Sequence, residues 1–382
     1  MQEPRFVTRM FVLCALANFA QSLSFNLFLH FPGYLARLGA AEVQIGFIIG
    51  LPAFAAIAAR PPIGRVMDRH GRRRVILMGG VINVLACSLY LGIHAIGPLV
   101  FAVRILHGFA EAMLFSSLFT LAADLVPAAR RTEGLAWFGA SGMLPVALAG
   151  LLGDSLLARL DYPALFGTSL ALAAVSLALS LTLREQAVAS GPGEASRGFL
   201  AALLQRDLLP LWWIGIVFSF GIASVFIFTK TFVMHKGVGS VGSFFSAYAG
   251  AALVVRILGG WLPDRVGPAR VLVPSLAVLC VGLGLLAFAA TPAAIVVAGL
   301  CSGVGHGFAF PILSGMVVTR AREADRGSAL AIFTALFDAG VLLGGPTLGA
   351  LIRAAGYPAM YGFCAVWIAF GTALFVAWER RR

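Results

Sequence analysis

Residues 64–74, GRVMDRHGRRR, lie between two long apolar segments and carry six charged side chains and two glycines. A charged, glycine-containing stretch this short predicts a tight turn between two membrane spans. Lys and Arg beside membrane spans favour the cytoplasmic side of the membrane, and this turn has five Arg. We therefore expect the turn to face the cytoplasm.

A second copy of this turn lies 196 residues further along the chain. The two copies share a glycine, an aspartate, an arginine and a second glycine, which are Gly64, Asp68, Arg69 and Gly71 in the first and Gly260, Asp264, Arg265 and Gly267 in the second. A duplicated cytoplasmic turn implies a duplicated membrane domain, as in transporters built from internal repeats.

The composition is that of an integral membrane protein. The chain is 60% hydrophobic and 12% charged, with a mean hydropathy of +0.94, whereas soluble domains are about 25% charged. Because a membrane-spanning helix needs about 20 apolar residues, the sequence predicts an all-α protein with twelve transmembrane helices. We place them at residues 8–31, 42–64, 74–94, 98–123, 132–158, 162–183, 208–235, 238–261, 271–290, 292–318, 327–352 and 358–378.

The twelve predicted helices divide into two pseudo-symmetric bundles of six. We expect an N-terminal bundle over residues 1–184, a cytoplasmic linker over 185–207 and a C-terminal bundle over 208–382. The linker contains Ser, Gly and Pro in its run 190–194, a composition typical of a flexible tether.

The basic residues are distributed as expected for a membrane protein with a fixed orientation. The net charge is +12, and 20 of the 28 Lys and Arg residues fall in the termini and in connections on the side of the 64–74 turn. This bias predicts a multi-pass protein of the bacterial cytoplasmic (inner) membrane with both termini in the cytoplasm, and no nucleic-acid partner. All five Cys fall within predicted spans, so we expect no disulfide, metal site or cofactor.

Polar residues inside the first predicted span mark one part of a candidate site. Asn18, Gln21 and Asn26 share one helical face, and a polar face in a membrane has to meet protein or water. Two readings stay open for this face. It forms hydrogen bonds between helices, or it lines a cavity.

Ionisable residues in the fourth predicted span mark another part. Arg104, His107 and Glu111 are spaced i, i+3 and i+7 and share a face near the middle of the membrane. Each such group costs at least about 2.5–3.5 kcal/mol there, which indicates a wet cavity or a paired network. A purely structural Arg–Glu pair is the alternative.

The second half carries further ionisable residues within its predicted spans. Lys230 lies in the outer part of the seventh span, His306 in the tenth and Asp338 near the middle of the eleventh. Lys230 either extends to the membrane surface or lines a cavity. The interiors of the third, sixth, ninth and twelfth spans have no Asp, Glu, Lys, Arg or His, so we expect the other helices to surround a central aqueous path.

The whole chain resembles the major facilitator superfamily. The family's signature after its second helix is a glycine, an Asp-Arg pair and a second glycine followed by basic residues, met here by Gly64, Asp68, Arg69, Gly71, Arg72 and Arg73. The resemblance implies that these residues form a cytoplasmic gate with Asp124, at the end of the fourth span, and with the second copy of the turn. It also implies a protein that works as a monomer.

Four further stretches bear on the branch within the family. Arg104 and Gly108 resemble the fourth-helix motif of proton-coupled members, and residues 306–311, HGFAFP, resemble bacterial sugar-efflux permeases. The motif of the drug–proton antiporters places a glycine and a proline next to each other in the fifth helix. In the fifth span here, Gly142 and Pro145 are not adjacent. The eleventh span has the better Gly-Gly-Pro match, at residues 344–346. The chain resembles the sugar-efflux and drug–proton antiporter branches, and it departs from the latter in the fifth span.

We accordingly expect a secondary active transporter, not an enzyme, that moves a small polar organic solute by alternating access. Efflux coupled to protons, that is antiport, is the primary hypothesis. The candidate residues of the proton-coupling and substrate cavity are Asp338, Glu111, Arg104, His107, His306, Lys230, Asn18, Gln21 and Asn26. The alternatives are an importer or facilitator of a small organic anion or sugar, and a membrane receptor that transports nothing.

Overall fold

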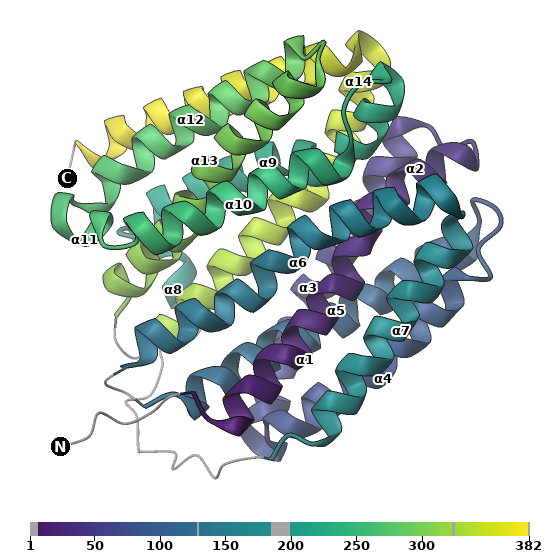
Figure 1. Cartoon of the computed structure of the whole chain (residues 1–382). Helices are drawn as coiled ribbons and strands as arrows, with labels where there is room; N and C mark the ends of the chain where they lie inside the picture. Colours follow the sequence, from purple (N-terminus) through teal and green to yellow (C-terminus); the bar gives the residue numbers. More distant parts are fainter. Residues whose placement is uncertain (1–6, 128–129, 185–198, 323–324, 381–382) are drawn as a thin grey trace. The chain divides into compact units, whose positions relative to one another are not determined.

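The computed structural model describes residues 7–127, 130–184, 199–322 and 325–380 (Figure 1). Helices account for 89% of the structure, and no strand occurs in these ranges. The predicted all-α class is therefore confirmed.

The chain divides into two compact units. Unit 1 comprises Met1–Gly39 and Leu51–Ala189, and unit 2 comprises Ala40–Gly50 and Ser190–Arg382. The helices of unit 1 are α1 (Arg9–Asn26), η1 (Leu27–His30), α2 (Phe31–Arg37), most of α3 (Glu42–His70), α4 (Arg72–Tyr90), α5 (Pro98–Leu125), α6 (Arg131–Arg159) and α7 (Tyr162–Leu181). Those of unit 2 are α8 (Phe199–Leu203), α9 (Leu209–Lys236), α10 (Val241–Gly259), α11 (Leu262–Val266), α12 (Pro268–Phe288), α13 (Pro292–Arg320) and α14 (Arg326–Glu379).

Eleven of the described helical segments are long and apolar enough to cross a membrane. The last, α14, has 54 residues and would be about 81 Å long at 1.5 Å per residue, more than twice the hydrocarbon thickness of about 30 Å. Gly356 interrupts α14 with a φ of 81° and a ψ of 173°. Because this kink falls between the eleventh and twelfth predicted spans, α14 supplies both of them, and the described chain has twelve spans.

The charged stretch 64–74 is more helical than predicted. α3 continues to His70 and α4 begins at Arg72, so Gly71 alone makes the turn, with a φ of 89°. The predicted extent of the turn was wrong because Arg and Met continue a helix readily, whereas a positive φ suits glycine. In the second copy the short α11 ends at Gly267, whose φ is 100°. Each copy therefore turns at its second glycine.

The first span is longer than predicted and changes its helical form on the way. A 3-10 turn, η1, separates α1 from α2, and the helix ends at Arg37 instead of residue 31. Pro32 lies in the first turn of α2. Since proline has no N–H to donate to the preceding turn, the α-helical ladder cannot run through this point unbroken.

The two units repeat the same helix pairings. In unit 1, α1 packs against α6 and α7, and α4 packs against α5 and α7. In unit 2, α9 packs against α14, and α12 packs against α13 and α14. Because α14 supplies the two spans that correspond to α6 and α7, the pairings match the internal repeat predicted from the duplicated turn.

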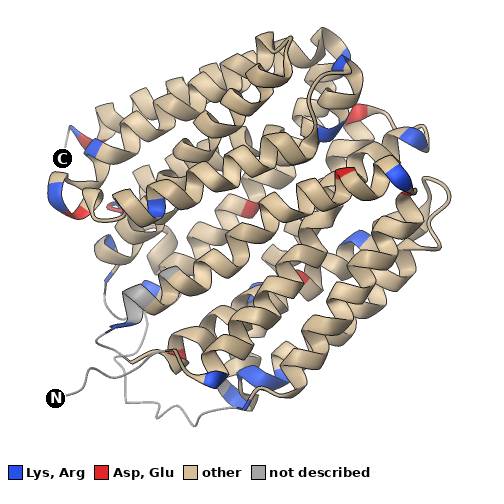
Figure 2. Cartoon of the chain, in the orientation of Figure 1, with Lys and Arg blue, Asp and Glu red and all other residues tan. Residues whose placement is uncertain are grey.

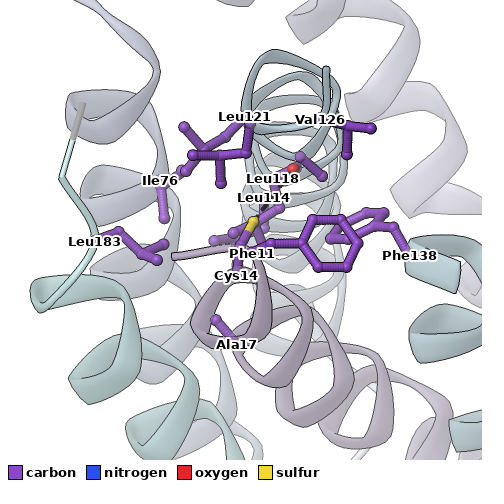
Figure 3. Packing of buried hydrophobic residues seen from close by; sticks show 12 residues of the cluster. Phe11, Cys14, Ala17, Ile76, Leu114, Leu118, Leu121, Val126, Phe138 and Leu183 are labelled. Carbon is purple, nitrogen blue, oxygen red and sulfur yellow. Dashed lines mark hydrogen bonds between the residues drawn. The ribbon is translucent and has the colours of Figure 1, made fainter. Parts of the chain in front are cut away.

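An apolar cluster at one end of unit 1 joins four helices, α1, α4, α5 and α6, and the residues that follow α5 and α7 (Figure 3). Its buried members are Phe11, Cys14, Ala17, Ile76, Leu114, Leu118, Leu121, Ala122, Leu125, Val126, Phe138 and Leu183. The Cys14 thiol is fully buried and donates to the carbonyl of Leu118 at 3.5 Å. Cys14 therefore acts as a packing residue.

Glycines allow helices within each unit to approach until their backbones touch. A Cβ atom on Gly108 of α5 would lie 2.4 Å from the Cα of Pro52 in α3. A Cβ atom on Gly303 of α13 would lie 2.1 Å from the carbonyl oxygen of Tyr248 in α10. Close approach of this kind is how helices gain packing energy in a membrane, where lipid tails compete with apolar side chains.

Residues 199–207, the part of the predicted linker that the structure describes, are hydrogen-bonded to unit 2. Trp212 Nε1 donates to the carbonyl of Leu203 in α8 at 3.0 Å, and Gln205 Nε2 donates to the carbonyl of Arg320 at 2.7 Å. Residues 185–198, which hold the run predicted to be flexible, lie outside the described residues.

Replacing Gly303 by Ala should destabilise the protein. The new methyl group would strike a backbone atom that cannot move independently, and overpacking of this kind costs about 1–3 kcal/mol. The measurement is the melting temperature of purified protein in detergent. Gly315→Ala is the control, because it lies in the same helix, α13, with no atom within 4 Å of its Cβ position. Equal melting temperatures for the two variants would contradict the packing argument.

Asp161 should make the stability of unit 1 depend on pH. Its carboxylate accepts from Arg37 Nη1 at 2.6 Å and from the N–H of Tyr162 at 2.8 Å. The hydrogen bond from Arg37, followed by that from Tyr162, holds the pKa of Asp161 below its usual range. A lowered folded-state pKa adds stability above the unfolded-state pKa of about 3.9, and this stability is lost as pH falls through the folded-state pKa.

The expected result is a melting-temperature difference between wild type and Asp161→Asn that is present at about pH 7 and shrinks towards about pH 3. The Asn side chain can still cap α7, so the comparison isolates the charge. The difference should also be small and weaken with salt, since both partners are exposed. A difference that does not vary with pH would contradict this account.

Candidate functional site

A chain of hydrogen bonds in unit 1 connects the first, third and fourth spans. Asn83 Nδ2 of α4 donates to Gln21 Oε1 of α1 at 2.7 Å. Gln21 Nε2 donates to Glu111 Oε2 of α5 at 2.5 Å. The two amide side chains are 1% and 2% exposed, and Glu111 is half-buried. We call Asn83, Gln21 and Glu111 the amide–carboxylate chain.

This chain continues away from the carboxylate into small polar groups. The Cys87 thiol donates to Asn83 Oδ1 at 3.8 Å, and it lies 3.4 Å from the Ser169 hydroxyl of α7. Ser24 Oγ donates to the carbonyl of Ser169 at 2.8 Å. From Cys87 through Asn83 and Gln21, each donor therefore points towards Glu111. A series of aligned hydrogen bonds is polarised in one direction and holds its members in place.

Arg104 and His107 form a second group in unit 1, around the hydroxyl of Tyr90. Arg104 Nη1 donates to the Tyr90 oxygen at 3.2 Å, and that hydroxyl lies 3.1 Å from His107 Nδ1. Since the Tyr90 oxygen accepts from Arg104, its own hydrogen can go to His107 Nδ1. His107 Nε2 is then the protonated nitrogen, and it is buried without a hydrogen-bond partner among the described residues.

Aromatic rings enclose this second group. His107 lies edge-on to Phe25 and Phe28, with ring centroids 5.1 and 4.8 Å apart, and the Arg104 guanidinium lies 5.6 Å from the centroid of Phe31. Arg104 is 4% exposed and His107 is fully buried. Arg104 and His107 are thus packed inside the helix bundle, whereas Glu111, one or two turns further along α5, is the more open of the three.

The remaining polar residues of the first span have separate partners. Asn18 Nδ2 donates to Ser141 Oγ of α6 at 2.9 Å. Asn26 Nδ2 donates to the carbonyl of Ser22, one turn back in the same helix, at 2.7 Å. Gln21 therefore joins the amide–carboxylate chain, whereas Asn18 and Asn26 donate their hydrogen bonds elsewhere.

Unit 2 has a histidine in the span that corresponds to α5. His306 of α13 is half-buried and forms a hydrogen bond through Nδ1 with the hydroxyl of Tyr248 in α10. The rings of Phe218 and Phe226 lie edge-on to it, at 5.3 and 6.3 Å between centroids. A histidine paired with a tyrosine inside an aromatic cage therefore occurs in both units.

Asp338 and Lys230 are both half-buried in long helices of unit 2. Asp338 lies in α14 between two residues that contact α9. Phe337 packs against Phe218 at 5.9 Å between ring centroids, and a Cβ atom on Gly340 would lie 3.0 Å from the carbonyl of Ile216. The carboxyl group is therefore carried on a closely packed helix.

At the predicted gate, the described contacts of unit 1 fix the start of α4. Arg72 Nε lies 3.1 Å from Asp124 Oδ2, which brings together two residues predicted to form the gate. Arg73 instead donates to the carbonyls of Leu183 and Leu181 at the end of α7, at 2.7 and 3.1 Å. Arg69 is exposed. The backbone of Gly64 and Asp68 belongs to α3, and the Asp68 side chain lies outside what the structure describes.

The second copy of the gate sequence is arranged differently. Gly260 follows the end of α10, and Asp264 and Arg265 are exposed on the short α11. The Arg265 guanidinium lies 4.8 Å from the centroid of the Trp261 ring. Lys and Arg lie mainly near helix ends in both units (Figure 2).

Asn83, Tyr90 and Tyr248 were not among the site residues predicted from the sequence. The third span has no Asp, Glu, Lys, Arg or His in its interior, and for that reason it was not among the helices expected to surround the aqueous path. A single Asn at the middle of an apolar helix was the available signal for Asn83, because an amide there requires a partner. Among the described residues, no three His, Cys, Asp or Glu side chains are grouped as a metal site requires.

Comparison with known proteins supports the same assignment over the full chain. The family model described as Major Facilitator Superfamily matches residues 11–262 and 237–382. An uncharacterized MFS-type transporter of Burkholderia mallei (strain SAVP1) is 28% identical over 360 residues, with 90% of this chain and 85% of the relative covered. An uncharacterized MFS-type transporter of Salmonella typhimurium is 25% identical over 348 residues, with 88% of each chain covered.

Solved structures share the fold at low sequence identity. A mutant of the nucleoside transporter NupG matches with a TM-score of 0.83 at 15% identity, covering 97% of this chain and 100% of that one. The human organic anion transporter MFSD10 matches with a TM-score of 0.74 at 18% identity, covering 98% and 100%. A POT family transporter in complex with 5-aminolevulinic acid matches with a TM-score of 0.80 at 14% identity, covering 98% and 96%. With its twelve spans, internal repeat and full-length family match, this chain belongs to the Major Facilitator Superfamily of membrane transporters.

Proposed function

We propose that this transporter exports a small polar organic solute in exchange for protons, by alternating access across the bacterial inner membrane. In this proposal the termini are cytoplasmic, the protein works as a monomer, and the duplicated Asp-Arg turns form the cytoplasmic gate. The export direction draws on the resemblance of residues 306–311 to bacterial sugar-efflux permeases.

The amide–carboxylate chain is the observation that carries the proposal. A carboxyl group in a membrane span is costly, and such groups are typical of proton pathways and substrate sites. Glu111 is half-buried and is held by Gln21, which Asn83 holds in turn. A carboxyl group kept in one position in this way can bind and release a proton at the same point of each transport cycle.

Charged and aromatic side chains within the spans suggest the kind of solute. Lys230 is half-buried and cationic, and Arg104, Tyr90 and His107 supply a second cation, hydrogen bonds and flat apolar surface. Because Arg104, Tyr90 and His107 are buried here, the proposal requires another state of the transport cycle to expose them to the solute. Such groups suit a solute with an anionic or strongly polar part and a planar part. The structural neighbours named for nucleosides and organic anions, and the one bound to 5-aminolevulinic acid, support a solute of this size and polarity.

Asp338 is the second candidate proton carrier, and it lies in the other unit. Each unit thus contributes one half-buried carboxyl group from the middle of a span. The proposal assigns the proton to Glu111 or Asp338, and substitution of each separates them.

If Glu111 carries the proton, Glu111→Gln should impair proton coupling while preserving the fold. The Gln side chain can still accept from Gln21 through its carbonyl oxygen, but it cannot bind and release a proton at neutral pH. The measurement uses wild-type and variant protein in vesicles with an imposed pH gradient. The rate of uphill transport should fall by about tenfold or more, the size of effect expected when one essential proton-transfer group is lost. Exchange of labelled for unlabelled solute should continue.

Asp154→Asn is a suitable control, because it removes a partly exposed carboxyl group of unit 1 that lies outside the amide–carboxylate chain. It should retain uphill transport. Full pH-driven transport by the Glu111→Gln variant would remove Glu111 from the coupling mechanism.

The solute itself should be identified by comparing metabolites inside and outside cells that make the wild type or the Asp338→Asn variant, at two external pH values. If Asp338 is the coupling group, a compound should accumulate outside cells only with the wild type. Depletion of a compound from the medium would instead indicate import. Unchanged pH-driven export by Asp338→Asn would exclude Asp338.

A further inference from the structure

A hollow of about 780 Å³ lies at one end of unit 1, away from the amide–carboxylate chain. Its lining comes from the start of α1, the start of α4 and the end of α7. The lining residues are Arg9, Met10, Leu13, Arg73, Leu181, Thr182, Leu183 and Arg184. We call it the basic hollow, because three of its eight lining residues are arginines and none is acidic.

The three arginines differ in how firmly hydrogen bonds and ion pairs hold their side chains. Arg73 is fixed, since its Nε and Nη2 donate to the carbonyls of Leu183 and Leu181. Arg9 and Arg184 are exposed, and neither forms an ion pair with an acidic residue within the described part of the chain. Asp124, the acidic residue that an ion pair brings to the start of α4, is engaged by Arg72.

The helix ends at this place add to the positive potential. α1 and α4 both begin beside the basic hollow, and neither has an acidic residue in its first turn. The N-terminal end of a helix carries a partial positive charge. The carbonyl groups at the end of α7 carry partial negative charge, which would offset the positive charge of the two helix starts. Two of these carbonyls, those of Leu181 and Leu183, accept hydrogen bonds from Arg73. The hollow therefore favours an anion.

The wall of the basic hollow is apolar and continuous with the interior of the unit. Leu183 is 1% exposed and belongs to the buried cluster with Phe11 and Cys14 (Figure 3), and Met10 and Leu13 pack against that cluster. Thr182 and Arg184 lie just beyond the end of α7, at the level where its membrane span stops. A cationic rim and an apolar wall at the boundary of a span match the two parts of a phospholipid.

We propose that the basic hollow binds the phosphate of an anionic phospholipid headgroup, with the glycerol and upper acyl chain against Met10, Leu13 and Leu181. Basic pockets between helices on the cytoplasmic side of membrane proteins recognise anionic lipids, because that leaflet is rich in them. Soluble phosphate shares the same chemistry at the rim, but it makes no use of the apolar wall. The assignment rests on the proposed cytoplasmic location of this end of unit 1, and it does not depend on the transported solute or on proton coupling.

The test measures lipid binding to the purified full-length protein by native mass spectrometry in detergent. The probes are phosphatidylglycerol, phosphatidylcholine with the same acyl chains, and inorganic phosphate. The wild type should bind phosphatidylglycerol more tightly than phosphatidylcholine. Arg9→Gln combined with Arg184→Gln should weaken phosphatidylglycerol binding by about tenfold or more, on the order expected for two basic groups near an anionic lipid.

Two matched variants make the result specific. Arg159→Gln combined with Arg353→Gln removes the same charge from two exposed arginines elsewhere, and it should leave phosphatidylglycerol binding unchanged. Arg9→Lys combined with Arg184→Lys keeps the charge and should retain most of the binding. Arg73 is left intact because it closes the end of α7, and equal melting temperatures would show that all variants are folded.

Three results would overturn the proposal. One is equal binding of phosphatidylglycerol by the wild type and the Arg9→Gln, Arg184→Gln variant. Another is an equal loss of binding in the control variant, which would indicate a non-specific charge effect. The third is competition by millimolar inorganic phosphate without any preference for phosphatidylglycerol, which would assign the hollow to a soluble anion.

Discussion

The constraint on which this structure depends is that a polar group placed inside an apolar helix bundle has to find its partner within the protein. Gln21 illustrates it, because both ends of its amide are engaged, one by Asn83 and the other by Glu111. An unpartnered amide in such a place costs about 1–3 kcal/mol. The three helices that contribute these side chains are therefore held in one register by side-chain chemistry as well as by packing.

Much of the fold could be predicted from the sequence, since spans and their repeat follow from hydropathy and from glycine. The positive φ of Gly71 and of Gly267 accounts for the recurrence of a glycine at the end of each charged copy. The length of α3 could not be predicted in the same way. Whether a charged stretch such as 64–70 turns or stays helical depends on what its side chains meet at the membrane surface, and periodicity does not carry that information.

The candidate site was predicted less completely. Glu111 and Gln21 were found because a polar residue in a span is rare, and the structure joins them. Asn83 and Tyr90 were overlooked because both lie in a helix whose interior has no charges, although they hold Gln21 and Arg104 in place. Which polar residues meet across helices depends on the rotation of each helix about its axis. That rotation is set by long-range packing, such as the close approach of α5 to α3 at Gly108.

The two units use related parts in different ways. In unit 1 the tyrosine that meets the histidine comes from the third span, and in unit 2 it comes from the eighth. The repeat therefore preserves a histidine in an aromatic cage while its hydroxyl partner has changed helix. A duplicated fold that keeps its helix pairing can change the side chains within it, which allows each half to acquire its own chemistry.

The direction of the hydrogen bonds in unit 1 gives the Glu111 carboxyl group two unequal oxygens. Oε2 accepts from Gln21, so one of its two lone pairs is already engaged. Turning the Gln21 amide by half a rotation would set its amino group against the donor of Asn83, and two hydrogen bonds would be lost together. The amide of Gln21 is therefore held in one of its two orientations, and this orientation fixes which group of the amide meets the carboxylate.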